Sequence, residues 1–157
     1  MRWALLVLLL GALPAIAETI QGRVVAVADG DTITLLDGTN RQHKVRLAGI
    51  DAPERRQAFH EASRQNLVRI AHGKRVVVDW YKLSYKRLVG NVYLDGTDIG
   101  LAQVTAGMAW HYKYYQSEQS LEDRRLYADS EDEARAMKRG LWSDANPSPP
   151  WDFRRAR

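Results

Sequence analysis

Hydrophobic and polar positions alternate along the first part of the chain. Three short runs, at 20–28, 32–36 and 43–50, are rich in β-branched residues and are separated by turns of Asp, Gly and Asn. Alternation with a period of two, interrupted by turns of this composition, is typical of consecutive short strands. The pattern therefore predicts a meander of three strands.

A helical pattern follows this meander. Asp51-Ala52-Pro53-Glu54 has the composition of a helix start, and apolar or small residues then recur at helical spacing until Gly73. Two more strands are predicted at 75–80 and 88–94. A short helix is predicted from Thr97 or Asp98 to Ala106.

A last helix is predicted after Ser120, which can cap it, and Gly140 is expected to end it. Its inward-facing residues are spaced three and four apart, and they are Tyr127, Ser130, Ala134, Met137 and Leu141. The order of elements predicts an α+β fold, mainly β, with a five-stranded OB-fold barrel and three helices. Such barrels often bind oligonucleotides, but the fold alone does not establish a function.

The two ends of the chain differ from its middle. Arg2, an apolar run at 3–10 and the small-residue site Ala15-Ile16-Ala17 have the order of a secretory signal peptide. A membrane anchor is the alternative, but the apolar run is short for a span. The predicted organisation is a signal peptide at 1–17, a barrel domain at 18–143 and a Pro/Arg-rich tail at 144–157, expected to be extended. We expect a secreted or periplasmic product without stable membrane association.

Composition narrows the chemistry. The 157 residues suit one domain, and the absence of cysteine excludes disulfides and thiolate chemistry. Any metal must therefore be held by oxygen or imidazole. The net charge of +4 and the pI of about 9.5 favour polyanionic partners over acidic ones.

Three carboxylates and two arginines are candidates for chemistry at one rim of the barrel. Asp31 and Asp51 would supply oxygen ligands for a hard divalent cation. Arg46 and Arg87 would neutralise a phosphate, and Glu54 would orient or deprotonate water. This set has the parts that phosphodiester hydrolysis requires.

Each of these residues also has a plainer explanation when taken alone. Asp31 could belong only to the turn that begins with Asp29, and Asp51 and Glu54 could be ordinary helix-start residues. The arginines could be solvated strand residues. Spacing alone does not show that the five side chains meet.

Three motifs occur in order along the chain. They are Val27-Ala28-Asp29-Gly30-Asp31-Thr32, Val45-Arg46-Leu47-Ala48-Gly49-Ile50-Asp51-Ala52-Pro53-Glu54, and Tyr85-Lys86-Arg87-Leu88-Val89-Gly90-Asn91-Val92-Tyr93. Together they resemble the staphylococcal nuclease (thermonuclease) family, and the resemblance extends over roughly residues 20–142. It implies a calcium-dependent nuclease that acts on DNA and RNA and leaves 3′-phosphate ends. We expect the protein to be a monomer.

The resemblance also assigns roles to individual residues. The positions of the motifs imply that Asp31, Asp51 and the Ala52 carbonyl bind Ca²⁺. They imply that the catalytic residues are Arg46, Glu54 and Arg87. The implied substrate-binding residues are Tyr85, Lys86 and Tyr115.

One departure from the family pattern keeps other functions open. Leu83 and Ser84 stand where the family usually has an acidic and a basic residue, which affects how a terminal phosphate is held. The alternative to a nuclease is therefore a non-catalytic OB-fold module that binds nucleic acid. A third possibility is an envelope protein that docks through its Pro/Arg tail.

Overall fold

A computed structural model describes residues 18–157, so the predicted signal peptide at 1–17 lies outside the described residues. The strands are β1 (Glu18–Val27), β2 (Thr32–Asp37), β3 (Gln42–Leu47), β4 (Ile50–Asp51), β5 (Arg75–Ser84), β6 (Arg87–Leu94), β7 (Thr97–Asp98) and β8 (Trp110–His111). The α-helices are α1 (His60–Ala71), α2 (Ile99–Thr105), α3 (Leu121–Ala136) and α4 (Pro150–Arg155). Two 3-10 helices, η1 (Lys113–Glu118) and η2 (Gly140–Ser143), complete the order.

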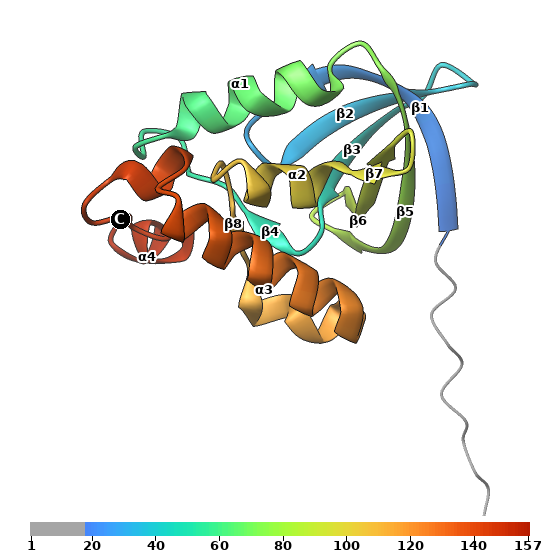
Figure 1. The fold of residues 1–157 in the computed structure, drawn as a ribbon. Coiled ribbons are helices and arrows are strands. Elements are labelled where there is room, and N and C mark those ends of the chain that lie inside the picture. The colour runs from blue at the N-terminus through green and yellow to red at the C-terminus, as the bar shows by residue number, and fades with distance from the viewer. Residues whose placement is uncertain (1–17) are drawn as a thin grey trace, which may run out of the picture.

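The main sheet closes on itself. Its strands run in the order β3-β2-β1-β5-β6-β7, and a parallel pairing of β3 with β6 places Val45 opposite Leu88. The pairing of β5 with β6 shifts register between Trp80 and Lys82, and a bulge of this kind adds the bend that closure needs. In Figure 1 the barrel forms one side of the molecule and the α-helices gather toward the other. The predicted α+β fold with a five-stranded barrel is confirmed, and α4 is a fourth helix beyond the three expected.

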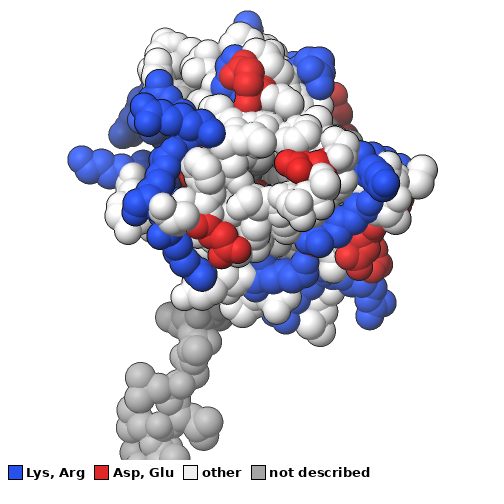
Figure 2. Space-filling view, turned by 90° about the vertical axis from the view of Figure 1, so that its left-hand side faces the viewer, with Lys and Arg blue, Asp and Glu red and all other residues white. Residues whose placement is uncertain are grey.

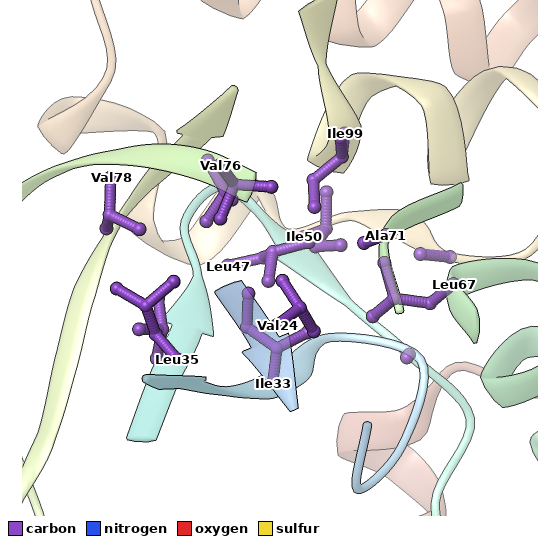
Figure 3. Close-up of a cluster of buried hydrophobic side chains, with 14 of the residues drawn as sticks. Val24, Ile33, Leu35, Leu47, Ile50, Leu67, Ala71, Val76, Val78 and Ile99 are labelled. Atoms are coloured by element: carbon purple, nitrogen blue, oxygen red, sulfur yellow. The ribbon is translucent and has the colours of Figure 1, made fainter. Parts of the chain in front are cut away.

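Alternate side chains of the barrel strands form the core. Figure 3 shows strand residues meeting Leu67 and Ala71 of α1 and Ile99 of α2. In β3, Val45 and Leu47 are buried in this core. Since side chains alternate across a strand, the residue between them, Arg46, projects from the opposite face. Packing of the core therefore determines where this arginine lies.

The first helix begins later than its sequence suggests. Asp51 and Ile50 form β4, which pairs with β8, and α1 starts only at His60. Arg56 and Phe59 have positive φ angles of 74° and 66°, which no helix interior accommodates. The predicted helix start at Asp51-Ala52-Pro53-Glu54 is therefore wrong, and Glu54 lies in a loop.

The inward face of α3 agrees only in part with the expected stripe. Ser120 caps the helix by accepting a hydrogen bond from the Asp123 N–H at 3.0 Å. Tyr127 and Ala134 are buried, but Met137 is 65% exposed because the helix already ends at Ala136. A charged residue, Glu131, takes an inward position instead. It accepts hydrogen bonds from the backbone N–H of His111 and from Lys113 Nζ, which explains its burial.

The C-terminal tail is not extended throughout, contrary to expectation. It forms α4, which starts with Pro150 at a position where the missing N–H costs no hydrogen bond. Trp151 stacks on Tyr112 with ring centroids 5.3 Å apart and meets Trp110 edge-on at 5.5 Å. Aromatic packing therefore fixes the tail against the domain. Among residues 18–157, none of the helices is long and apolar enough to span a membrane.

A buried glutamine joins the barrel to two helices. Gln103 of α2 donates from Nε2 to the carbonyls of Gly30 at 2.7 Å and Ser63 at 3.1 Å. Its Oε1 accepts from Asn66 Nδ2 at 2.6 Å. Because Gly30 directly precedes Asp31, this amide holds the turn that carries a candidate site residue.

We expect Gln103→Leu to lower the free energy of unfolding by about 2–4 kcal/mol, because two buried carbonyls lose a hydrogen-bond donor. Urea denaturation would measure the change. The same substitution at exposed Gln65 of α1 is the control, with an expected change within about 0.5 kcal/mol. An equally small effect at Gln103 would contradict a structural role for its amide.

Candidate active site

A cavity of about 990 Å³ opens at one rim of the barrel. The structure brings eight of the nine predicted site residues to its lining, namely Asp31, Arg46, Asp51, Ala52, Glu54, Tyr85, Arg87 and Tyr115. Figure 2 shows Lys and Arg side chains around a hollowed face of the molecule, with acidic side chains near its centre. The face therefore combines a basic periphery with carboxylates.

Asp31 lies just before β2 and is held on both oxygens. Its Oδ2 accepts from the Ala52 N–H at 2.8 Å, and its Oδ1 accepts from Thr32 Oγ1 at 3.0 Å. The preceding Gly30 has no space for a side chain, since an added Cβ would overlap the Ser63 hydroxyl. The hydrogen bond from Ala52 to Asp31 joins the start of β2 to the exit of β4.

Arg46 connects the two predicted metal carboxylates. Its Nη2 lies 3.2 Å from Asp31 Oδ2 and 3.2 Å from Asp51 Oδ1. Its Nη1 donates to the Leu47 carbonyl at 2.8 Å, which fixes the direction of the guanidinium. Asp51 itself is placed by the pairing of β4 with β8, where it lies opposite Trp110. The two carboxylates therefore converge, as the sequence could not show.

Glu54 and Asp51 share a partner that sequence reasoning missed. Arg154 of α4 donates from Nη2 to Asp51 Oδ2 at 2.8 Å and from Nη1 to Asp51 Oδ1 at 3.2 Å. The same Nη1 donates to Glu54 Oε1 at 2.5 Å. The only signal in the sequence was the basic character of the tail. Arg154 thus adds to the predicted Arg46 and Arg87 a further arginine, which contacts the site carboxylates and comes from the last helix of the chain.

The hairpin between β5 and β6 carries the remaining basic and aromatic candidates. Ser84 pairs with Arg87, and Tyr85 and Lys86 form the turn with φ angles of 49° and 61°, as a type I′ turn requires. Arg87 lines the cavity, and among residues 18–157 it has no ion-pair partner. Tyr85 also lines it although it is 93% exposed, whereas exposed Lys86 does not. The hairpin tip therefore presents Tyr85, not Lys86, to the cavity.

The 3-10 helix η1 after β8 also lines the cavity and contacts β5. Tyr115 lies 4.6 Å from Lys82 Nζ, measured to the ring centroid, and Lys82 also pairs with Glu118 at 2.5 Å. Ser84 lines the cavity, but Leu83 is 65% exposed and does not. Lys82 thus lies beside Leu83 and Ser84, the two positions at which the sequence departs from the family pattern.

Burial raises the pKa values of two aspartates that line the cavity, Asp29 and Asp51. Burial raises the pKa of Asp51, while the hydrogen bonds from Arg154 and the charge of Arg46 act in the opposite direction. Burial and the neighbouring charge of Asp31 raise the pKa of Asp29 to about 6. The ionised carboxylates of the cavity are therefore less well stabilised than they would be in water, which favours the binding of positively charged groups there.

The donors in the cavity fit a hard cation. Asp31, Asp51 and the Ala52 carbonyl offer only oxygen, and no cluster of three or more His, Cys, Asp or Glu that could hold a metal occurs within residues 18–157. A cation held here would take two carboxylates and would fill its shell with backbone oxygen and water. Ca²⁺ accepts such mixed oxygen ligands.

We expect Asp29→Asn to stabilise the protein near neutral pH. The folded pKa of Asp29 is about 6, compared with 3.8 ordinarily, so the folded state binds the proton more tightly. The wild-type free energy of unfolding therefore falls as the pH rises through this interval, and the variant avoids the loss. The variant should gain about 1–3 kcal/mol at about pH 7 and nothing below about pH 4.

Urea denaturation at several pH values, in a chelator, would measure this gain. The same substitution at exposed Asp132 of α3 is the control. A gain that does not depend on pH would refute the electrostatic cause.

Similarity to known proteins agrees with this arrangement. Residues 44–144 match the family described as staphylococcal nuclease homologues. A protein of Escherichia coli named an uncharacterized endonuclease is 40% identical over 151 residues, which cover 95% of this chain and 94% of the relative. A micrococcal nuclease of Shigella flexneri is 41% identical over 161 residues, which cover 96% of this chain and 88% of the relative.

A match over a shorter part of the chain is a probable staphylococcal-like nuclease of Oryza sativa subsp. japonica. It is 40% identical over 116 residues, which cover 73% of this chain but only 30% of that relative. The names of these relatives support a hydrolytic nuclease function and a nucleic acid substrate. The motifs, the closed barrel and these similarities lead to one conclusion: the chain belongs to the staphylococcal nuclease family.

Proposed function

We propose that the chain is an exported, calcium-dependent nuclease that hydrolyses phosphodiester bonds of DNA and RNA and leaves 3′-phosphate ends. The observation that carries this proposal is the meeting of Arg46, Glu54 and Arg87 with two buried aspartates in one cavity. Positive groups for a phosphate, a carboxylate for water and oxygen ligands for a cation are therefore available together.

The arginines would stabilise charge on the phosphate. Arg87 has no ion-pair partner among residues 18–157 and is free to bind two phosphoryl oxygens with its planar fork. Arg46 is turned toward Asp31 and Asp51, so its charge would lie beside the bound cation's ligands. Held by Asp31, Asp51 and the Ala52 carbonyl, Ca²⁺ would add positive charge where the phosphoryl group becomes more negative.

Glu54 would act on water. Its carboxylate would accept a proton as the water oxygen forms a bond to phosphorus. The bond from phosphorus to the 5′ oxygen would break, and that oxygen would take up a proton from solvent water to become a 5′-hydroxyl. The phosphate would then remain on the 3′ side. Glu54 suits this role because it lies in a loop at the cavity and its side chain is 32% exposed to solvent.

We expect Glu54→Gln to reduce cleavage of labelled single-stranded DNA in calcium by roughly 10²–10⁴-fold, because the amide cannot accept the proton. Calcium affinity, measured by titration calorimetry, should change little. Wild-type cutting should disappear in a chelator, and Glu122→Gln on the exposed start of α3 should cut normally. If Glu54→Gln lost calcium binding and turnover equally, the carboxylate would be a metal ligand rather than a base.

We expect Arg87→Ala to lower kcat by roughly 10²–10³-fold, because one positive group facing the developing phosphoryl charge is removed. Arg75→Ala is the matched control, since Arg75 is an exposed arginine of β5 outside the cavity. End-group analysis of the wild-type products would test the 3′-phosphate. Full activity of Arg87→Ala would remove this residue from the mechanism.

A non-catalytic module that binds nucleic acid is the second candidate. Leu83 and Ser84 favour it, because they lack the charges that the family usually has at these positions. The presence of both arginines and all three carboxylates argues against it. Salt-sensitive binding of DNA without any cutting would establish this second candidate.

Export and oligomeric state are part of the proposal. The signal-like residues 1–17 support secretion or a periplasmic location, with cleavage after Ala17 and no stable attachment to the membrane. We expect the processed protein to be a monomer. N-terminal sequencing of the exported protein and light scattering would test these two points.

A further inference from the structure

The guanidinium of Arg154 lies among the acidic groups of the cavity. It engages both carboxylate oxygens of Asp51 and one oxygen of Glu54. The Asp51 side chain is only 3% exposed, so little water can replace this partner. Asp51 Oδ1 also accepts from Arg46 at 3.2 Å, so each oxygen of this carboxylate has at least one positively charged donor.

We propose that Arg154 sets the divalent-cation affinity of the site by competing with the cation for Asp51. This inference rests on the metal site of the proposed function and adds a residue that the motifs do not include. Arg154 lies beyond residues 44–144, the part of the chain that matches the family.

Competition follows from charge and burial. A cation bound to Asp51 needs the same carboxylate oxygens that now accept hydrogen bonds from the Arg154 guanidinium. Two positive groups on one carboxylate repel each other, and the repulsion is strong where water is nearly excluded. The cation therefore binds at the cost of the contacts between Arg154 and Asp51.

The tail stays in place when Arg154 moves. Trp151 packs on Tyr112, Gln57 Nε2 donates to the Ser148 carbonyl at 2.6 Å, and Arg157 Nη2 donates to the Arg55 carbonyl at 2.7 Å. None of these contacts involves the Arg154 side chain. The arginine is thus tethered close to Asp51, which keeps its effective concentration high.

Release of Arg154 would have a second consequence. The same Nη1 atom bonds Asp51 and Glu54, so the side chain leaves both carboxylates in one movement. Its side chain is 39% exposed, which gives it room to turn toward solvent. Cation binding and the freeing of the proposed base are therefore coupled through one residue.

Calcium titration calorimetry of four full-chain proteins tests the proposal. They are the wild type, Arg154→Ala, Arg154→Lys and the control Arg155→Ala. Arg155 carries the same charge on the same helix, is 78% exposed and, among residues 18–157, forms an ion pair only with Asp152, at 3.7 Å. We expect roughly tenfold tighter calcium binding in Arg154→Ala. Arg154→Lys should show a smaller gain in affinity, because lysine keeps the positive charge but cannot form the two parallel hydrogen bonds of the guanidinium. Arg155→Ala should show no gain.

Thermal unfolding with and without calcium gives a second measurement that is independent of activity. Calcium should raise the midpoint of Arg154→Ala more than that of the wild type, because tighter binding stabilises the folded state more. If Arg154→Ala does not fold without calcium, Arg154→Lys decides the question with the same two measurements.

Unchanged calcium affinity in the Arg154 variants would overturn the proposal. Weaker affinity would also overturn it, since it would mean that Arg154 positions the ligands and does not compete. Calcium-dependent cutting by the wild type would then leave the proposed nuclease intact. No calcium binding by any of the four proteins, together with cutting that resists a chelator, would instead overturn the metal site itself.

Discussion

The bridge that Arg46 makes between Asp31 and Asp51 is the interaction on which the site depends. It joins the start of β2 to β4 through two contacts of 3.2 Å, on a side chain that the Val45 and Leu47 packing directs away from the core. Two buried carboxylates would repel each other without it. The closure of the barrel therefore determines both the position and the charge balance of the cavity.

Backbone groups hold this arrangement more than exposed side chains do. The Ala52 N–H bonds Asp31 at 2.8 Å, and Gln103 bonds the Gly30 carbonyl at 2.7 Å. The Ser63 hydroxyl, which lies against Gly30, donates to the Met108 carbonyl at 2.6 Å. A rigid frame of this kind fixes the carboxylates before any ligand arrives, which is what a site for charge stabilisation requires.

Ionising the buried acidic groups of the cavity costs free energy, and neighbouring positive charges offset this cost. Burial raises the pKa values of Asp29 and Asp51, so the ionised forms are less stable than in water. The positive charge of Arg46 acts on both aspartates, and Arg154 adds its charge at Asp51. A residue from the tail thus completes the charge balance of a site whose other charged members come from the barrel and the loop that follows β4. Docking of the tail is therefore linked to ligand binding at the site.

The sequence by itself determined the five longer strands, their turns and the carboxylate and arginine motifs, because these depend on local periodicity and on residues close in the chain; the two-residue strands β4, β7 and β8 were not predicted as separate strands. Only the tertiary structure decided where α1 begins, since the pairing of Asp51 with Trp110 is long-range. It also decided the inward place of Glu131 and the contact of Arg154 with Asp51, 103 residues away. No local pattern specifies such contacts, because they arise only when the closed barrel and the docked tail bring distant segments together.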